Sequence, residues 1–293
     1  MFYNNIILNK CYRGVLWKKL YKNKEWLQAK FKELKYAQRI GKEIGVSGDT
    51  IEYWRKKFNI LKENDNQANR KYTLNENYFS VIDNEEKAYW LGFIMADGCV
   101  TKSQPNKPYN RFEINLKIED FSHLEKLNKL MEYNKPLITK SVNSRGHISE
   151  ICQLRVNSAK LCTDLMKHDI CPNKTGKECI PESVPKKLLR HFLRGFFDGD
   201  GTLYSDEKNL YCSVCGSSKH MIDQVKELIK EELDIDLYIN ESKEYSVPFY
   251  IIGTKNQQNV KLFLDYIYKD ANIYLDRKYN KYLSHYAPLS GDA

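Results

Sequence analysis

The sequence predicts an α+β protein of two similar units, each with the element order αββαββα, preceded by a small all-helical domain. Three observations predict this fold class. Two short stretches of the same design, 90–98 and 193–201, place Asp97 and Asp200 103 residues apart. Apolar periodicity indicates the same succession of helices and strands after each stretch. The surplus of positive charge lies in the first quarter of the chain.

The helical domain is expected within residues 1–60. Charge is unevenly distributed along the chain. Residues 1–72 carry 17 Lys and Arg against 7 Asp and Glu, whereas residues 73–293 carry 30 against 31. A basic module on a nearly neutral body favours attachment to a polyanion, although a solvated lysine-rich face would also account for the charge. No long apolar run or amphipathic basic helix is evident, so nucleic acid is favoured over a membrane.

Residues 36–58 have the pattern of a helix, a turn and a second helix, with an earlier helix at about 22–34. Gly41 suits a position that needs a small contact residue, and Gly45 suits a tight turn. Ser47 suits a helix N-cap, and Ile51 and Trp54 suit the core. The window 40–52 is similar to resolvase-like helix-turn-helix modules. On DNA, four residues would face the major groove and three would approach phosphates: Ser47, Asp49, Thr50 and Tyr53, then Arg55, Lys56 and Lys57. A helical hairpin without DNA contact is the alternative.

The rest of the chain is divided into a polar, asparagine-rich linker at 61–80, a first unit at 81–180 and a second at 181–293. After the first motif we expect strands 99–102 and 111–118, helix 121–131, strands 137–143 and 149–156, and helix 158–168. After the second motif we expect strands 202–205 and 209–215, helix 219–233, strands 237–241 and 247–253, and helix 257–268.

Small residues recur four apart in both motif stretches, Gly92 with Ala96 and Gly195 with Gly199. Helices lacking bulky side chains on one face can pack with their backbones close together, which would bring Asp97 and Asp200 together. Each Asp would end its helix, at the negative end of the macrodipole, before a glycine in a left-handed cap. Two carboxylates crowded there need a cation. The alternative is two buried helices that end in ordinary Asp-Gly turns.

These strings resemble the signature of the LAGLIDADG homing endonucleases, and residues 77–92 look like the family's bacterial and phage members. The resemblance covers about residues 72–286. Met95 departs from the acid common at the sixth motif position, whereas Asp198 keeps it. The resemblance implies a site-specific double-strand DNA endonuclease in which two curved antiparallel sheets face DNA beside the paired helices.

The same resemblance implies the metal site and the cleavage pattern. Asp97 and Asp200 would bind divalent ions with the carbonyls of Ala96 and Gly199, and each site would cut one strand, leaving 3′ overhangs. Oxygen ligands suit Mg²⁺, with Mn²⁺ as a substitute. A lysine often follows the last helix of each unit in this family, which identifies Lys174 and Lys278 as catalytic candidates. Surface lysines are the alternative.

DNA contacts are expected from the strands and the linker. Strand 111–118 alternates polar and apolar residues, and polar side chains that suit base edges occupy similar places on neighbouring strands. The candidates are Arg111, Glu113, Asn115, Lys117, Gln153, Arg155, Asn209, Tyr211 and Ser213. Family members often thread the linker along a groove, which adds Arg70 and Lys71. An ordinary solvated sheet face is the alternative.

We therefore expect a monomer that recognises a long asymmetric double-stranded target. Scattered cysteines disfavour zinc and fit reduced thiols, no secretory signal is evident, and the residue usage is typical of an A/T-rich genome. A cytoplasmic bacterial or phage protein is expected, with an organelle as another origin. Two other functions use the same scaffold: a catalytically inactive DNA-binding regulator, and a maturase whose partner is intron RNA. Retention of both motif acids favours the nuclease.

Overall fold

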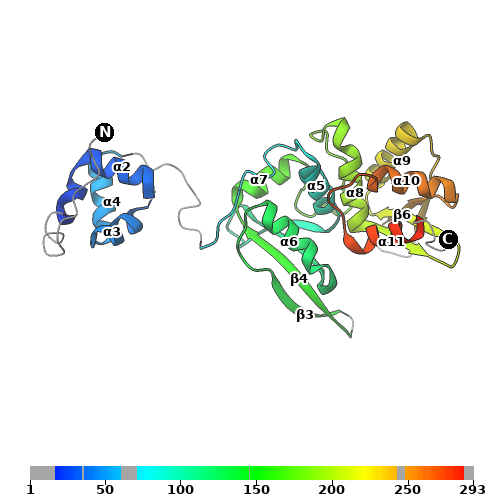
Figure 1. Ribbon diagram of the computed structural model, residues 1–293, viewed down its shortest axis with the longest axis horizontal. Helices are drawn as coiled ribbons and strands as arrows, with labels where there is room; N and C mark the ends of the chain where they lie inside the picture. The colour runs from blue at the N-terminus through cyan, green and yellow to red at the C-terminus, as the bar shows by residue number, and fades with distance from the viewer. Residues whose placement is uncertain (1–16, 35, 61–70, 145, 243–247, 287–293) are drawn as a thin grey trace, which may run out of the picture. The chain divides into compact units, whose positions relative to one another are not determined.

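The chain divides into two compact units, Met1–Thr73 and Leu74–Ala293, which are described here one at a time. The structure is a computed structural model that describes residues 17–34, 36–60, 71–144, 146–242 and 248–286 (Figure 1). No described helix has both the length and the apolar character needed to cross a bilayer. The seven cysteines among the described residues are free thiols.

Unit 1 is helical around a small apolar core. Its elements are η1 (Trp17–Lys22), α2 (Lys24–Leu34), α3 (Ala37–Ile44) and α4 (Gly48–Lys57). Leu27, Ile40 and Ile51 are fully buried and come from the three α-helices, so each helix contributes an anchor to the same core. The helix, turn and helix expected at residues 36–58 are confirmed as elements.

The turn between α3 and α4 depends on two glycines. Gly45 ends α3 with φ of 74°, in the left-handed region that glycine tolerates best. A Cβ on Gly41 would lie 2.5 Å from the carbonyl oxygen of Val46, so only glycine lets the turn approach α3 this closely. Ser47 caps α4, because its Oγ accepts the backbone N–H of Thr50 at 3.2 Å.

Unit 2 repeats one order of elements twice. The first half contains α5 (Glu85–Asp97), β1 (Gly98–Lys102), β2 (Tyr109–Lys117), η2 (Ile118–Asp120), α6 (Phe121–Leu130), β3 (Ile138–Ser144), β4 (His147–Asn157) and α7 (Ala159–Lys167). The second half contains η3 (Lys186–Leu188), α8 (Leu189–Asp200), β5 (Gly201–Ser205), β6 (Leu210–Gly216), α9 (Lys219–Leu233), β7 (Tyr238–Ser242), β8 (Phe249–Gly253), α10 (Gln257–Tyr268) and α11 (Asp276–Tyr286). The predicted αββαββα repeat is confirmed, and α11 is an element that the sequence pattern did not indicate.

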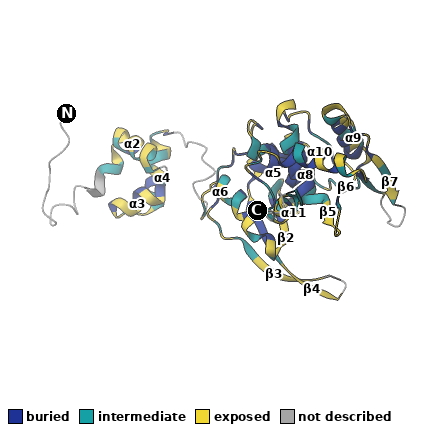
Figure 2. Cartoon of the chain, turned by 45° about the vertical axis from the view of Figure 1, so that its right-hand side comes forward, coloured by how far each residue is buried: buried dark blue, intermediate teal, exposed yellow. Residues whose placement is uncertain are grey.

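Each half folds its four strands into one antiparallel sheet. The strand orders are β1-β2-β4-β3 and β5-β6-β8-β7, so the two sheets have the same topology. In the first sheet Phe112, Ile114 and Leu154 are buried on the helix side. In the second sheet Cys212 and Val214 occupy the corresponding side. The β3–β4 hairpin projects from the body of the unit in both ribbon views (Figures 1 and 2), and its outer residues are exposed.

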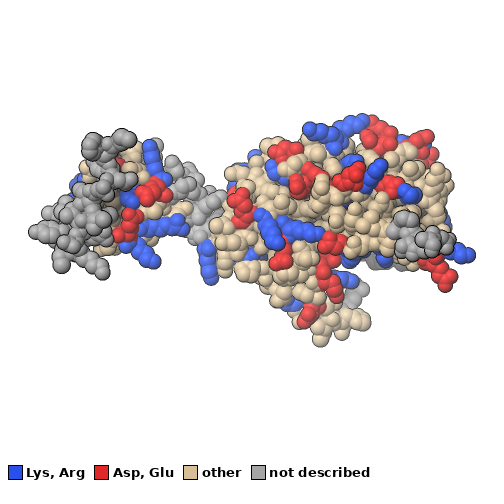
Figure 3. Space-filling view, viewed as in Figure 1, with Lys and Arg blue, Asp and Glu red and all other residues tan. Residues whose placement is uncertain are grey.

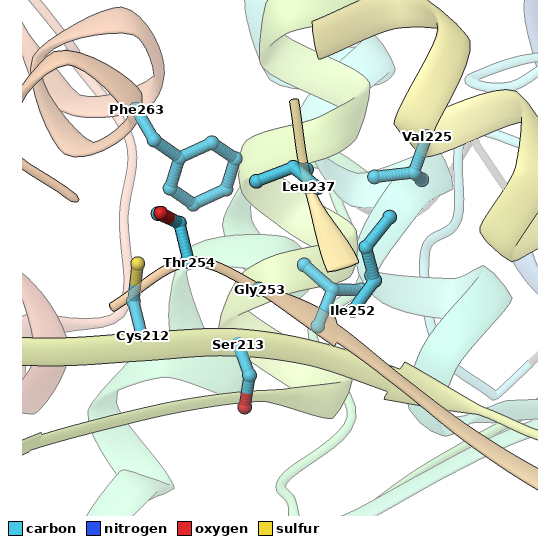
Figure 4. A pocket seen from close by; sticks show the side chains of 9 residues that line it. Cys212, Ser213, Val225, Leu237, Ile252, Gly253, Thr254 and Phe263 are labelled. Carbon is cyan, nitrogen blue, oxygen red and sulfur yellow. The ribbon is translucent and has the colours of Figure 1, made fainter. Parts of the chain in front are cut away.

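Helices α5 and α8 lie side by side at the centre of unit 2 and are buried along most of their length (Figure 2). Trp90, Phe93 and Phe196 are among their large buried side chains. A cavity of about 10 Å³ lies between the second sheet and helices α9 and α10, lined by Cys212, Val225 and Phe263 among others (Figure 4). That volume is about the room that one water molecule needs, so this is a packing defect and not a ligand site.

Candidate functional site

The two motif helices touch through their backbones at two glycines. A Cβ on Gly92 of α5 would lie 1.9 Å from the carbonyl oxygen of Phe192, and one on Gly195 of α8 would lie 1.8 Å from that of Tyr89. Real side-chain carbons do not approach backbone atoms this closely, so both positions require glycine. The predicted close packing of the two helices is therefore confirmed.

The packing brings Asp97 and Asp200, the last residues of α5 and α8, to one end of the helix pair. Gly199 directly precedes Asp200 in the chain. A Cβ on Gly199 would lie 3.2 Å from the Oδ2 atom of Asp97. Ala96 and Gly199 meet at the same seam, because that Cβ would stand 2.4 Å from the Ala96 Cβ. Acids 103 residues apart in sequence thus become neighbours.

Crowding changes how these acids hold their protons. Burial, followed by the negative charge of Asp97, raises the pKa of Asp200 to about 7. Burial also raises the pKa of Asp97, while the positive charges of Lys174 and Lys278 lower it. The Asp97 side chain is nevertheless exposed to solvent and Asp200 is half-buried, so water or an ion can reach this densely surrounded pair. Two such acids favour a bound cation over two free negative charges.

The glycines after the acids correct one prediction. We expected left-handed caps, but Gly98 has φ of −84° and Gly201 has φ of −82°, which is ordinary extended backbone that begins β1 and β5. Glycine is needed there for space: a Cβ would lie 2.8 Å from the Ile94 carbonyl oxygen in the first half and 2.4 Å from that of Phe197 in the second. The chain therefore passes from helix directly into strand beside each acid.

Both candidate lysines reach the seam, with different contacts. Lys174 is half-buried, and its Nζ donates to the carbonyl oxygen of Ala96 at 2.8 Å. Lys278, which belongs to α11, is 5% exposed; its Nζ donates to the Phe197 carbonyl at 2.5 Å and to that of Gly201. Burial lowers the pKa of Lys278 to about 8, against the charge of Asp198, which raises it. Each half thus supplies one ammonium group near the acids.

A buried polar cluster that the sequence analysis did not assign supports this seam. The carboxylate of Asp198 is fully buried and accepts hydrogen bonds from Tyr89 at 2.8 Å, from Tyr268 at 2.5 Å and from the backbone N–H of Leu275 at 2.7 Å. Met95, at the same motif position in the first half, is also fully buried but apolar. Asp198 therefore ties α5 and α10 to the segment that leads into α11 and Lys278.

Arg194 forms the second part of that cluster. Its guanidinium is fully buried and donates to the carbonyls of Ile267 and Ile273, each at 2.8 Å, and to Glu85 of α5 at 2.6 Å. The signal in the sequence is two charged residues, Arg194 and Asp198, four apart within an otherwise apolar helical stretch. Charged residues are almost never fully buried without partners, so that spacing could have identified the cluster.

The predicted contacts on the first sheet lie on the side that faces away from the helices. Glu113 and Arg155 form an ion pair across the β2–β4 ladder. The Arg111 Nε donates to Asn157 at 3.3 Å, while Asn115 and Lys117 are exposed. Gln153 differs: it is 3% exposed, and its Nε2 donates to the Asn115 Oδ1 at 2.7 Å. Gln153 therefore orients Asn115 and is not itself open to a ligand.

On the second sheet, Tyr211 and Ser213 are half-buried on β6, and Asn209 lies just before that strand. The Tyr211 ring stacks on Tyr204 at 4.8 Å, and its hydroxyl donates to Asp206 at 3.0 Å. The Asn209 backbone N–H donates to the same carboxylate at 2.7 Å, so Asn209 belongs to the β5–β6 turn.

In unit 1, Ser47, Asp49 and Tyr53 are exposed along α4, and Thr50 is half-buried. Arg55 is held within the unit, because its guanidinium donates to Glu52 at 2.8 and 3.0 Å and to the Ile60 carbonyl at 2.6 Å. This arrangement fits a structural role for Arg55 better than a phosphate contact. Lys71 is exposed, and Arg70 lies outside the described residues. Figure 3 shows charges of both signs dispersed over the visible face of unit 2.

Family models match both halves of unit 2. Residues 187–268 match the model of the LAGLIDADG-like domain, and residues 86–152 match that of the WhiA LAGLIDADG-like domain. A curated relative, the replication factor C small subunit of Methanocaldococcus jannaschii, is 28% identical over 216 residues, which are 73% of this chain and 11% of that protein. The chain thus spans a small fraction of that relative's length.

Solved structures resemble the same unit. The homing endonuclease I-WcaI bound to its DNA recognition sequence is 14% identical with a TM-score of 0.51, covering 77% of this chain and 97% of the other. Full-length DUF199/WhiA from Thermatoga maritima is 15% identical with a TM-score of 0.42, covering 75% of this chain and 69% of the other. The likeness to I-WcaI and the two family-model matches show that the described part of unit 2 has a two-unit LAGLIDADG fold, with a LAGLIDADG-like domain in each half.

Proposed function

We propose that this protein is a metal-dependent, sequence-specific DNA endonuclease that hydrolyses one phosphodiester on each strand of an asymmetric duplex and leaves 3′ overhangs. The observation that carries the proposal is the pair Asp97 and Asp200 at the end of two helices whose backbones touch at Gly92 and Gly195. The negative helix ends and the raised pKa of Asp200 make that pair a poor place for two free charges and a good place for cations.

The donor atoms fit a hard divalent ion such as Mg²⁺, with Mn²⁺ as a substitute. No cluster of three or more His, Cys, Asp or Glu side chains that could hold a metal occurs among the described residues. The protein would therefore contribute the two carboxylates with the nearby carbonyls of Ala96 and Gly199, and leave other positions to water and phosphate, as Mg²⁺ prefers. When bound, divalent ions supply an activated water, charge neutralisation at phosphorus and stabilisation of the leaving 3′ oxygen.

The lysines complete the proposed catalytic groups. Lys278 is held within the protein by the carbonyls of Phe197 and Gly201, and its pKa of about 8 keeps most of its charge at neutral pH. In the first half, the carbonyl oxygen of Ala96 holds the Lys174 ammonium group by a hydrogen bond. Ammonium groups in these places can hold a proton near the reacting phosphate or stabilise its developing charge.

We also propose that unit 1 acts as a helix-turn-helix module that extends the contacted DNA. The exposed residues of α4, which include Asp49, Tyr53, Lys56 and Lys57, support this role. One chain with two unlike halves can recognise an asymmetric target as a monomer. Cleavage at one locus suits intron homing by a mobile element, which a bacterial or phage cytoplasm would host.

The test uses a plasmid in which the genomic sequences that flank the gene are joined without it. The full chain should linearise this plasmid with Mg²⁺ but only bind it with Ca²⁺. Asp97→Asn and Asp200→Asn should bind the plasmid yet cleave it at least about 10³-fold more slowly. Asp223→Asn, which changes a partly exposed acid on α9 that pairs with Lys219, is the matched control and should cleave at the normal rate.

The second candidate function is a DNA-binding regulator without catalytic activity. The match of residues 86–152 to the WhiA LAGLIDADG-like model favours it. Tight binding of the plasmid by the full chain, with no cleavage in Mg²⁺ or Mn²⁺, would establish this function in place of the nuclease.

A further inference from the structure

The two sheets of unit 2 present different chemistry on the faces that point away from the helices. We define the first face as the odd-numbered residues of β1, of β2 from Arg111 onward and of β4, with the even-numbered residues of β3, following the strand register up to its shift after Thr101. It carries five charged residues: Arg111, Glu113, Lys117, Lys140 and Arg155. Four positive residues against one negative residue give this face a net charge of +3, and Glu113 is already paired with Arg155.

The second face consists of the even-numbered residues of β5 and β7 with the odd-numbered residues of β6 and β8. Within these described strands it carries no charged residue. Beside small and polar residues it carries five aromatic or aliphatic side chains: Tyr204, Tyr211, Tyr238, Phe249 and Ile251. Figure 4 shows that the Ser213 side chain, on this face, points away from the cavity that Cys212 lines on the helix side.

The two faces occupy equivalent positions in the fold. Cys99, two residues after Asp97, pairs with Glu113, which pairs with Arg155. Thr202, two residues after Asp200, pairs with Ser213, which pairs with Gly253. The same row of each sheet thus holds an ion pair in the first half, and a serine beside a glycine in the second.

The apolar groups on the second face are accessible. Tyr204 is 53% exposed and Tyr238 is 39% exposed, while Phe249 and Ile251 are half-buried. The hydroxyl of Tyr211 is anchored on Asp206, which holds the stacked Tyr204–Tyr211 pair in one orientation. Exposed aromatic side chains gathered on one face mark a binding surface more often than a stabilising one.

We infer that the two faces recognise DNA half-sites of different composition. The uncharged second face selects thymine-rich sequence through apolar contact with the 5-methyl groups of thymine in the major groove. The first face selects guanine and binds phosphates through Arg and Lys, which suit those acceptors. This inference rests on the DNA-binding part of the proposed function, and it does not depend on cleavage.

The test begins with a duplex library that is randomised over the target length and bound by the full chain in Ca²⁺. The enriched sequence should be rich in A·T pairs in one half and contain conserved G·C pairs in the other. Uracil is then substituted for thymine in one half at a time, which removes only the methyl groups. In the A·T-rich half each lost methyl contact should weaken binding about fourfold. In the other half the same change should leave the affinity unaltered.

Matched variants assign each half-site to a sheet. Ile251→Ala should abolish the sensitivity to uracil in the A·T-rich half. Asn115→Ala, at an exposed position on the first face, should leave that sensitivity intact and relax a base preference in the other half. Ile251→Val, which keeps most of the side chain, serves if the alanine variant is less stable, and it should give an intermediate sensitivity.

The possible failures are distinguishable. An enriched target with similar composition in both halves, or one in which uracil weakens binding equally in both, overturns this inference and leaves the proposed nuclease standing. If no sequence is enriched from the library, the protein does not recognise a DNA sequence. The proposed function then fails together with this inference.

Discussion

The two halves of unit 2 are alike where backbones meet and unlike where side chains face other groups. Gly92 and Gly195 make the same backbone contact from opposite helices, and the two sheets have the same strand order. At the sixth motif position, however, one half buries Met95 and the other buries Asp198. The shared backbone arrangement therefore depends on glycines that leave room for close contact, whereas the buried side chains differ between the two halves.

The same contrast separates the lysines. Lys174 lies half-buried in the segment after α7. Lys278 of α11 is buried, next to the cluster around Asp198. The first half has no Asp at the position of Asp198, and its lysine stays closer to solvent. A buried charge needs other charges and hydrogen-bond partners nearby, so the polar interior of the second half and its enclosed lysine belong together.

The largest expected effect tests the likeness of the halves. Gly92→Ala and Gly195→Ala should each lower the free energy of unfolding by at least ~3 kcal/mol, because the added methyl group would overlap a backbone carbonyl of the facing helix. Urea denaturation of the full chain measures the change. Gly216→Ala is the control, since its Cβ would meet only the Phe196 Cζ at 3.9 Å, and it should change stability by less than ~0.5 kcal/mol. Unequal losses for Gly92 and Gly195 would break the equivalence of the halves.

The second effect tests their difference. Asp198→Asn should lower the free energy of unfolding by about 2–3 kcal/mol, because the amide cannot accept from Tyr89, Tyr268 and Leu275 as the carboxylate does. Met95→Leu, a change of similar size in the first half, should cost under ~1.5 kcal/mol. The measurement is the same denaturation. A neutral Asp198→Asn would show that the three hydrogen bonds to this carboxylate do not stabilise the second half.

The smallest effect concerns the pH dependence of metal binding. A proton and a metal ion compete for Asp200, whose pKa is about 7, so the acid is mostly protonated below pH 7 and ionised above it. The affinity of the full chain for Mn²⁺, measured by calorimetric titration without DNA, should therefore rise with pH through a midpoint at about 7 and level off at higher pH.

Asp97→Asn sharpens this measurement. The variant removes the neighbouring charge that raises the pKa of Asp200, so the midpoint of the pH profile should move below 7. Its total affinity should also fall, because one carboxylate ligand is lost. An unchanged midpoint would show that the two acids do not interact and that the seam is not a shared site.

Local pattern was enough to predict most of the fold. The bounds of α9 and α10 agree with the predicted helices, and the eight strands occur where alternating or apolar runs were found. The exception is α11, a tyrosine-rich and charged segment that shows little apolar periodicity. It folds as a helix because Lys278 and the aromatic rings of Tyr279 and Tyr282 pack inward, which composition did not indicate.

Local pattern also predicted part of the candidate site. The spacing of small residues was sufficient to bring Asp97 and Asp200 together, because glycine has no side chain to keep two helices apart. The hydrogen-bond partners of Gln153 and Arg55 could not be predicted from local pattern. Gln153 alternates with apolar residues like an outward-facing residue, yet neighbouring groups cover it and Asn115 accepts its hydrogen bond.

The sequence by itself determined the repeat, the order of elements and the meeting of two acids, because periodicity and glycine spacing act over a few residues of one helix or strand. Only the tertiary structure decided that Asp198 and Lys278 are enclosed, and that one sheet face is charged while the other is not. Enclosure and pKa depend on what other segments bring to the same place. The partners that enclose Asp198 and Lys278 come from distant segments, and no pattern within one helix identifies those partners.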